Sequence, residues 1–80
     1  MKGIKMYCLF KQKELKEVVI DVEIIAIGDR EQCISKAYDD YNFWNTLTHL
    51  TLDEIEQRLD EDRLKRFHDP EWSVYKLREV

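Results

Sequence analysis

The sequence predicts a single α+β domain spanning residues 1–80, with the element order β-β-α-α-β. Three observations carry this prediction. Ile4–Phe10 has the period of two that is typical of a strand, and Val18–Ile27 is rich in β-branched residues. Capping boxes at Asp29 and Thr51 mark the starts of two helices, and Trp72–Val80 alternates again. We therefore expect a three-stranded antiparallel sheet with both helices packed on one face.

The first two strands are expected to form an antiparallel hairpin across the charged segment Lys11–Glu17. The second strand should present one apolar face, made of Val18, Ile20, Val22, Ile24 and Ala26. The last strand must lie beside the first or the second strand. The first is favoured, because the exposed edge of the second strand would then carry Asp21 and Glu23, which protect against edge pairing.

The two helices are specified by their first residues and by their apolar stripes. Asp29 with Gln32, and Thr51 with Glu54, are capping boxes, and Leu50 can contact Ile55 across the second helix start. The first stripe comprises Cys33, Ile34, Ala37, Tyr38, Tyr41 and Trp44, with Asp39 and Asp40 off it. The second comprises Leu52, Ile55, Leu59, Leu64 and Phe67, and Asp69-Pro70 ends that helix.

Composition excludes several classes of protein. The longest apolar stretch, Val18–Ile27, is interrupted by two acidic residues and is too short to span a bilayer. Met6–Phe10 is too short for the apolar region of a signal peptide. Only two glycines are present, too few for a phosphate-binding glycine loop. These features predict a cytoplasmic protein that does not enter a membrane.

The side chains that could support catalysis or bind a metal do not form a recognisable pattern. Cys8, Cys33, His49 and His68 lack the spacing of a metal site, so we expect neither a metal nor another cofactor. Cys33 lies in a first helical turn, which would lower its pKa, but also on the apolar stripe, which favours a buried structural thiol. Asp39 and Asp40 point to different helix faces. We identify no catalytic residue and predict that the protein is not an enzyme.

The charge distribution gives the main functional hypothesis. Residues 53–62 contain six acidic residues and one arginine, in a chain with a net charge of −4. One interpretation is a solvated helix whose charges complement the helix dipole. The other is an acidic surface that binds a host or phage protein with a basic surface. The residues of this predicted acidic surface are Asp39, Asp40, Asp53, Glu54, Glu56, Asp60, Glu61 and Asp62.

Direct binding of nucleic acid is the alternative. It would use Lys11, Lys13 and Lys16 of the hairpin, with Tyr7 to stack on a base. The net charge of −4 and the pI near 5.1 argue against it, because affinity for phosphates comes mainly from positive charge. We expect no such binding.

One part of the chain resembles a known family. In Val18–Tyr41, a β-branched strand leads into Ala26-Ile27-Gly28-Asp29-Arg30-Glu31-Gln32 and then a helix with Ala37 and Tyr38. This segment resembles the hairpin and helix of small phage and plasmid proteins of the DpnD/PcfM type. Cys33 stands where such proteins usually have alanine, and Thr51–His68 has no counterpart in the pattern. The resemblance implies a mobile-element protein that inhibits or modulates a host protein, such as nucleic-acid-directed defence machinery, by contact.

Overall fold

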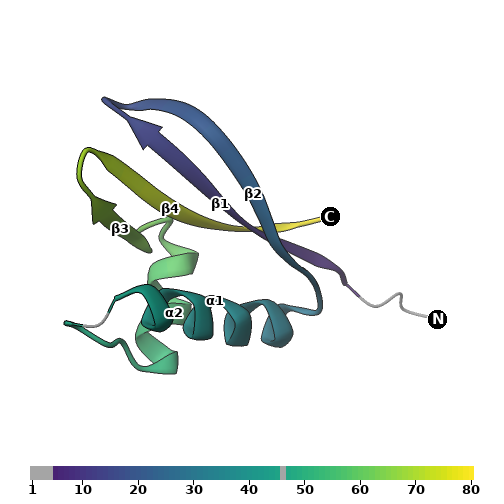
Figure 1. Cartoon of the computed structure of the whole chain (residues 1–80). Coiled ribbons are helices and arrows are strands. Elements are labelled where there is room, and N and C mark those ends of the chain that lie inside the picture. Colours follow the sequence, from purple (N-terminus) through teal and green to yellow (C-terminus); the bar gives the residue numbers. More distant parts are fainter. Residues whose placement is uncertain (1–4, 46) are drawn as a thin grey trace.

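The computed structural model describes residues 5–45 and 47–80, and its architecture is α+β, as predicted (Figure 1). Within them lie β1 (Tyr7–Leu15), β2 (Val18–Gly28), α1 (Arg30–Trp44), α2 (Leu52–Asp60), β3 (Lys65–His68) and β4 (Glu71–Glu79). The sheet is antiparallel with the order β2-β1-β4-β3. The last strand therefore lies beside the first, as favoured. The number of strands was predicted wrongly, because β3 is a fourth strand.

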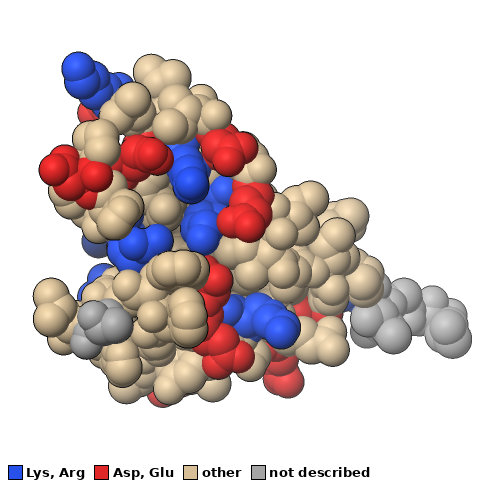
Figure 2. All heavy atoms as spheres, in the orientation of Figure 1, with Lys and Arg blue, Asp and Glu red and all other residues tan. Residues whose placement is uncertain are grey.

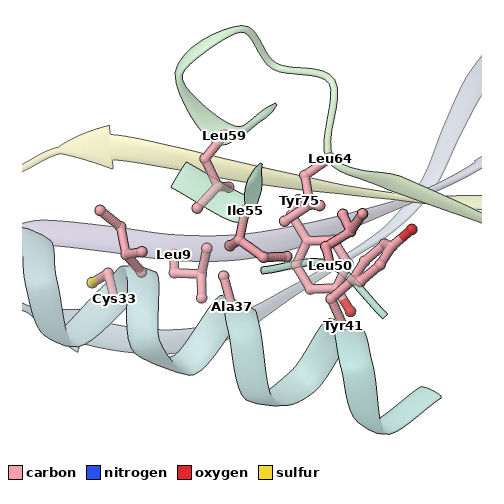
Figure 3. Packing of buried hydrophobic residues seen from close by; sticks show 10 residues of the cluster. Leu9, Cys33, Ala37, Tyr41, Leu50, Ile55, Leu59, Leu64 and Tyr75 are labelled. Atoms are coloured by element: carbon pink, nitrogen blue, oxygen red, sulfur yellow. The ribbon is translucent and has the colours of Figure 1, made fainter. Parts of the chain in front are cut away.

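Both helices pack on the same face of the sheet, and the core lies between the two layers (Figure 3). Leu9 of β1 and Tyr75 of β4 are fully buried there. Four of the six residues in the predicted α1 stripe belong to this core, whereas Tyr38 and Trp44 are exposed. The remaining core residues are Cys33, Ile34, Ala37, Tyr41, Leu50, Ile55, Leu59 and Leu64. Burial on one side of the sheet therefore holds the fold together.

The first hairpin is longer than predicted. We expected the first strand to end at Phe10, but β1 continues to Leu15, and Ile4 lies outside the described residues. Lys16 and Glu17 form the whole turn, with φ angles of 51° and 69°. Two consecutive residues with positive φ are typical of the tight turn whose twist matches that of the strands. Glycine or asparagine usually occupies these positions, so the usual turn signal is missing from the sequence here.

The predicted apolar face of β2 is also wrong, because two irregularities break its period of two. The register with β1 shifts between Leu9 and Phe10 and again between Lys13 and Glu14. Paired residues of antiparallel strands direct their side chains to the same side. Val18 and Ala26 are therefore on the helix side, opposite Leu15 and Leu9. Val22 and Ile24, opposite Gln12 and Phe10, are on the other side and are exposed.

The second helix ends eight residues earlier than predicted. Its C-terminus is closed by two backbone hydrogen bonds, from Asp62 N–H to the Leu59 carbonyl and from Arg63 N–H to the Arg58 carbonyl. Asp62 adopts a left-handed conformation with φ of 55°. This pairing is the Schellman motif, in which glycine normally occupies the left-handed position. Because no glycine occupies this position, the sequence contains no stop signal here and predicts a longer helix.

Residues of the predicted second stripe beyond this end belong to other elements. Leu64 lies in the loop after α2 and is buried, and Phe67 lies in β3 and is exposed. Leu52 is on α2 but is also exposed. Asp69 and Pro70 form the turn between β3 and β4 rather than the end of a helix.

Both helix starts were predicted correctly. The Asp29 carboxylate accepts from Gln32 N–H at 2.8 Å, and the Gln32 side chain accepts from Asp29 N–H at 3.1 Å. Thr51 and Glu54 make the equivalent pair of bonds, of 3.2 and 2.9 Å. Gly28 leaves room for the first box, because a Cβ there would lie 2.5 Å from Gln32 Oε1. Neither helix of the described residues has the length and the apolar composition to cross a membrane.

Candidate functional site

The predicted acidic surface is largely engaged in contacts within the chain. The Arg30 guanidinium, at the start of α1, pairs with Glu56 at 2.5 Å and with Asp60 at 2.6 Å on α2. These hydrogen bonds raise the pKa of Arg30. Two of the eight predicted residues thus connect the helices to each other. Because these carboxylates are already paired with a cation, they attract a basic partner less strongly than free carboxylates would.

Two further acidic residues have structural roles at the ends of α2. Glu54 completes the capping box, and its hydrogen bonds with Thr51 lower the pKa of this carboxyl. Asp62 accepts two hydrogen bonds from Arg78, of 2.9 and 3.0 Å, and lies 3.9 Å from Lys76. The bonds from Arg78 are the main reason why the pKa of Asp62 is lowered. They attach the end of α2 to β4.

Asp40 points toward the sheet and belongs to a polar cluster beside the core. The Tyr75 hydroxyl donates to its carboxylate, and the Lys11 ammonium lies 3.6 Å from it. Lys11 is buried and also lies 3.7 Å from Glu23 of β2. Burial raises the pKa of Tyr75 strongly, and the hydrogen bond to Asp40 adds to this, so the phenol stays protonated. The cluster therefore positions α1 on the sheet.

Asp39, Asp53 and Glu61 are what remains of the predicted acidic surface. Within residues 5–45 and 47–80 their carboxylates make no ion pair or hydrogen bond. Asp39 lies on α1, Asp53 is the second residue of α2, and Glu61 is the C-cap of α2. On the face in Figure 2, acidic and basic atoms are interspersed. The structure does not bring the eight residues together as one free acidic area.

The basic hairpin of the alternative hypothesis is also partly neutralised. Lys11 is held by Asp40 and Glu23, and Lys13 is paired in register with Asp21. Lys16 lies in the turn between β1 and β2. A phosphate backbone would therefore meet these lysines beside two acidic side chains of β2.

The two cysteines differ in their burial. Cys33 is buried, as predicted, and its thiol lies 3.6 Å from the Tyr7 carbonyl. Burial raises the pKa of this thiol, which disfavours the nucleophilic thiolate. Cys8 is also a free thiol, and it is half-buried. No group of three or more potential metal ligands occurs in the part of the chain that the structure describes.

The sheet itself provides a surface that the sequence did not predict. We define the open face as the side of the sheet opposite to the helices. Its members follow from the strand register, because they alternate with Leu9 and Tyr75. The open face comprises Cys8, Phe10, Gln12, Glu14, Val19, Val22, Ile24, Ile27, Lys65, Phe67, Trp72, Val74, Lys76 and Arg78.

Large apolar side chains make up much of the open face. Six of them are 40% to 63% exposed, namely Val19, Val22, Ile24, Ile27, Phe67 and Trp72. The rings of Phe67 and Trp72 are 5.0 Å apart, and the Lys65 ammonium lies 5.0 Å from the Trp72 ring centre. Within the described residues no helix covers this side (Figure 1). Several exposed apolar side chains on one uncovered face are typical of an interaction site.

The outer edge of β2 borders the open face. This strand of eleven residues is the first in the sheet order and pairs only with β1 in the described structure. On its open side it carries β-branched residues, and on its helix side it carries Asp21 and Glu23. The Val22 amide donates to the Asp21 carboxylate at 2.9 Å. An acidic side chain thus satisfies a backbone donor of this edge strand.

Comparisons with protein-family models, with curated proteins and with solved structures find no match. The resemblance to DpnD/PcfM-type proteins therefore stays a prediction.

The sequence does not predict the open face, because a fold of one helical layer on one sheet needs only one apolar side of the sheet. The helices carry one apolar stripe each, which is enough to cover one side of a sheet. The apolar residues of Val18–Ile27 are more numerous than one face requires. That excess, together with Phe67 and Trp72, was the signal that could have indicated a second apolar surface.

Proposed function

We propose that this protein acts without catalysis, by binding another protein through the open face of its sheet. The observation that carries the proposal is the set of six exposed apolar side chains on a face that no helix of the described chain covers. Such side chains gain little from folding, and their transfer out of water on binding is favourable, by about 25 cal/mol per Å². The phenylalanine and tryptophan pair adds the kind of aromatic anchor that often dominates binding energy.

The role suggested by the resemblance remains part of this proposal. A mobile-element protein that inhibits or modulates a host protein needs an accessible contact surface and no active site. The open face meets that requirement better than the helices do, because five of the eight acidic residues proposed earlier contact groups of their own chain. A cytoplasmic location and a basic partner stay compatible with this role.

The proposal is tested by affinity capture with matched variants. Val19→Lys introduces a charge on the open face, and Val18→Lys introduces the same charge next to it, on the opposite side of the strand. A partner recovered with wild-type protein should be lost with Val19→Lys or Ile24→Lys and retained with Val18→Lys. A third variant, Asp53→Asn with Glu61→Gln, tests the acidic surface.

Two results would contradict the proposal. One is a partner that is lost only with the acidic variant, which would return the site to α2. The other is a stable homodimer in light scattering that dissociates with Ile24→Lys, because a second copy would then occupy the open face. Nucleic acid is assayed in parallel, and nanomolar binding that Lys13→Gln and Lys16→Gln abolish would favour the alternative function.

A further inference from the structure

Resting on the proposed function, we infer that the outer edge of β2 binds an extended segment of the partner in which basic residues alternate with apolar residues. The segment would add a strand to the sheet. An edge strand directs alternate backbone N–H and C=O groups away from its neighbour, and these groups can pair with an incoming chain. β2 is eleven residues long, and its regular part between the two register shifts is residues 21–24.

The chemistry of the segment follows from the side chains on the two sides of β2. On the helix side are Asp21 and Glu23, and the Glu23 side chain is 67% exposed despite its contact with Lys11. On the open side are Val22 and Ile24. Directly opposed residues of paired strands contact each other, and opposite charges or β-branched pairs are favourable there. A complementary segment therefore places lysine or arginine toward the helices and apolar residues on the open face.

The hydrogen bond from the Val22 amide to the Asp21 carboxylate gives the edge a means of selection. This bond, of 2.9 Å, occupies a donor that an incoming carbonyl group would need. A neutral or acidic segment would have to displace this exposed carboxylate into solvent and would offer no cation in exchange for the lost bond. A basic side chain opposite Asp21 gives the carboxylate a new partner and releases the amide. The edge thus favours a basic strand over a neutral or acidic one.

Two registers for pairing this edge with a second copy of the chain bring acidic residues together. In an antiparallel pair of copies centred on Val22, Asp21 of one copy would face Glu23 of the other. A pair centred on Glu23 would place the two copies of this glutamate opposite each other. Like charges directly opposed in a sheet are destabilising. The same charges that disfavour these two registers favour a basic segment.

The experiment uses the whole chain and short synthetic peptides in which one residue type alternates with valine. Lysine is the test residue, and glutamate and threonine are the comparisons. Binding is measured by fluorescence anisotropy, and the exchange of the Val22 amide with solvent is followed by NMR. We expect the lysine peptide to bind most tightly and to slow exchange at Val22 by about tenfold or more. Proline in place of the central valine should abolish both effects, because it removes a backbone donor.

Variants separate pairing at the edge from general attraction between charges. Asp21→Asn with Glu23→Gln should weaken binding of the lysine peptide by about five- to tenfold. Asp39→Asn with Asp53→Asn, which removes the same charge from the helices, should leave it unchanged. Asp21→Ala should reduce the preference for lysine over threonine, because it removes the carboxylate that guards the Val22 amide.

The inference is overturned if the lysine peptide does not bind, if it binds without slowing exchange at Val22, or if the two double variants weaken binding equally. These results leave the proposed function intact as long as Val19→Lys and Ile24→Lys still release the captured partner. Conversely, a partner that those variants retain contradicts the proposed function whatever the peptides do.

Discussion

The two faces of the sheet use similar residues for different purposes. On the covered face, Leu9 and Tyr75 are fully buried against the helices, whereas on the open face Ile24 and Trp72 remain exposed. These residues lie on three strands that pair side by side. Burial, rather than residue type, decides whether an apolar side chain stabilises the chain. The covered face therefore accounts for folding, and the open face is available for a contact outside the molecule.

The largest test of this contrast compares two truncations. Leu9→Ala should lower the free energy of unfolding by about 3 kcal/mol, because it leaves a cavity in a fully buried site. Ile24→Ala, on the adjacent strand, should change it by no more than about 0.5 kcal/mol. Urea denaturation followed by circular dichroism measures both. Equal losses would mean that the open face is buried in solution.

The polar cluster of the covered face gives a smaller expected effect. Tyr75→Phe removes the hydroxyl that donates to Asp40 and should cost about 1 to 2 kcal/mol. Tyr38→Phe is the control, since the Tyr38 side chain is partly exposed on the same helix as Asp40. The same denaturation experiment reports both variants. A loss for Tyr38→Phe as large as that for Tyr75→Phe would refute the role given to the cluster.

The turn between β1 and β2 gives a third test, because its residues Lys16 and Glu17 both have positive φ angles. Glu17→Gly should raise the free energy of unfolding by about 1 kcal/mol, because glycine adopts the φ of 69° without strain. Glu17→Ala removes the same carboxylate but keeps the Cβ atom and should give no such gain. Thermal unfolding of the two variants distinguishes relief of strain from loss of charge.

The smallest effect concerns the polar end of the open face, where Asp62 pairs with Arg78. Asp62→Asn should cost roughly 0.5 kcal/mol at neutral pH, since the carboxylate is partly exposed and the pair is screened by solvent. The pKa of Asp62 is lower in the folded chain than in the unfolded chain. Its contribution is therefore complete above the unfolded pKa, about 3.9, and is lost as the pH falls through the folded pKa. A variant whose deficit persists at the lowest pH would show that backbone conformation, and not charge, is the cause.

The sequence was most informative where a side chain makes a local bond. Asp29 with Gln32 and Thr51 with Glu54 were predicted as capping boxes and form them. The core residues of α1 followed from helical spacing in the same way. The two boundaries that were missed, at Lys16 and at Asp62, share a physical cause. Each places a residue other than glycine in the left-handed region, so the usual signal was absent.

The candidate site could not be predicted from local sequence patterns, because it is determined by contacts between residues far apart in the sequence. Arg30 is separated from Asp60 by thirty positions, yet the pair decides that this carboxylate is not free. The irregularities in the β1–β2 register decide which residues of β2 reach the open face. Asp21 and Glu23 were interpreted correctly as residues of a sheet edge, because the favoured strand order already placed the second strand outermost.

The central pairing of the sheet also constrains the order of events during synthesis. β1 pairs with β4, and Tyr7 is opposite Glu79. The pairing of these two strands can therefore be completed only after Glu79 has left the ribosome. Until then the β1–β2 hairpin is exposed along both of its edges, and such hairpins aggregate readily. Contacts between distant positions also slow folding. The acidic side chains of β2 would then protect the nascent chain during this interval, before any partner is present.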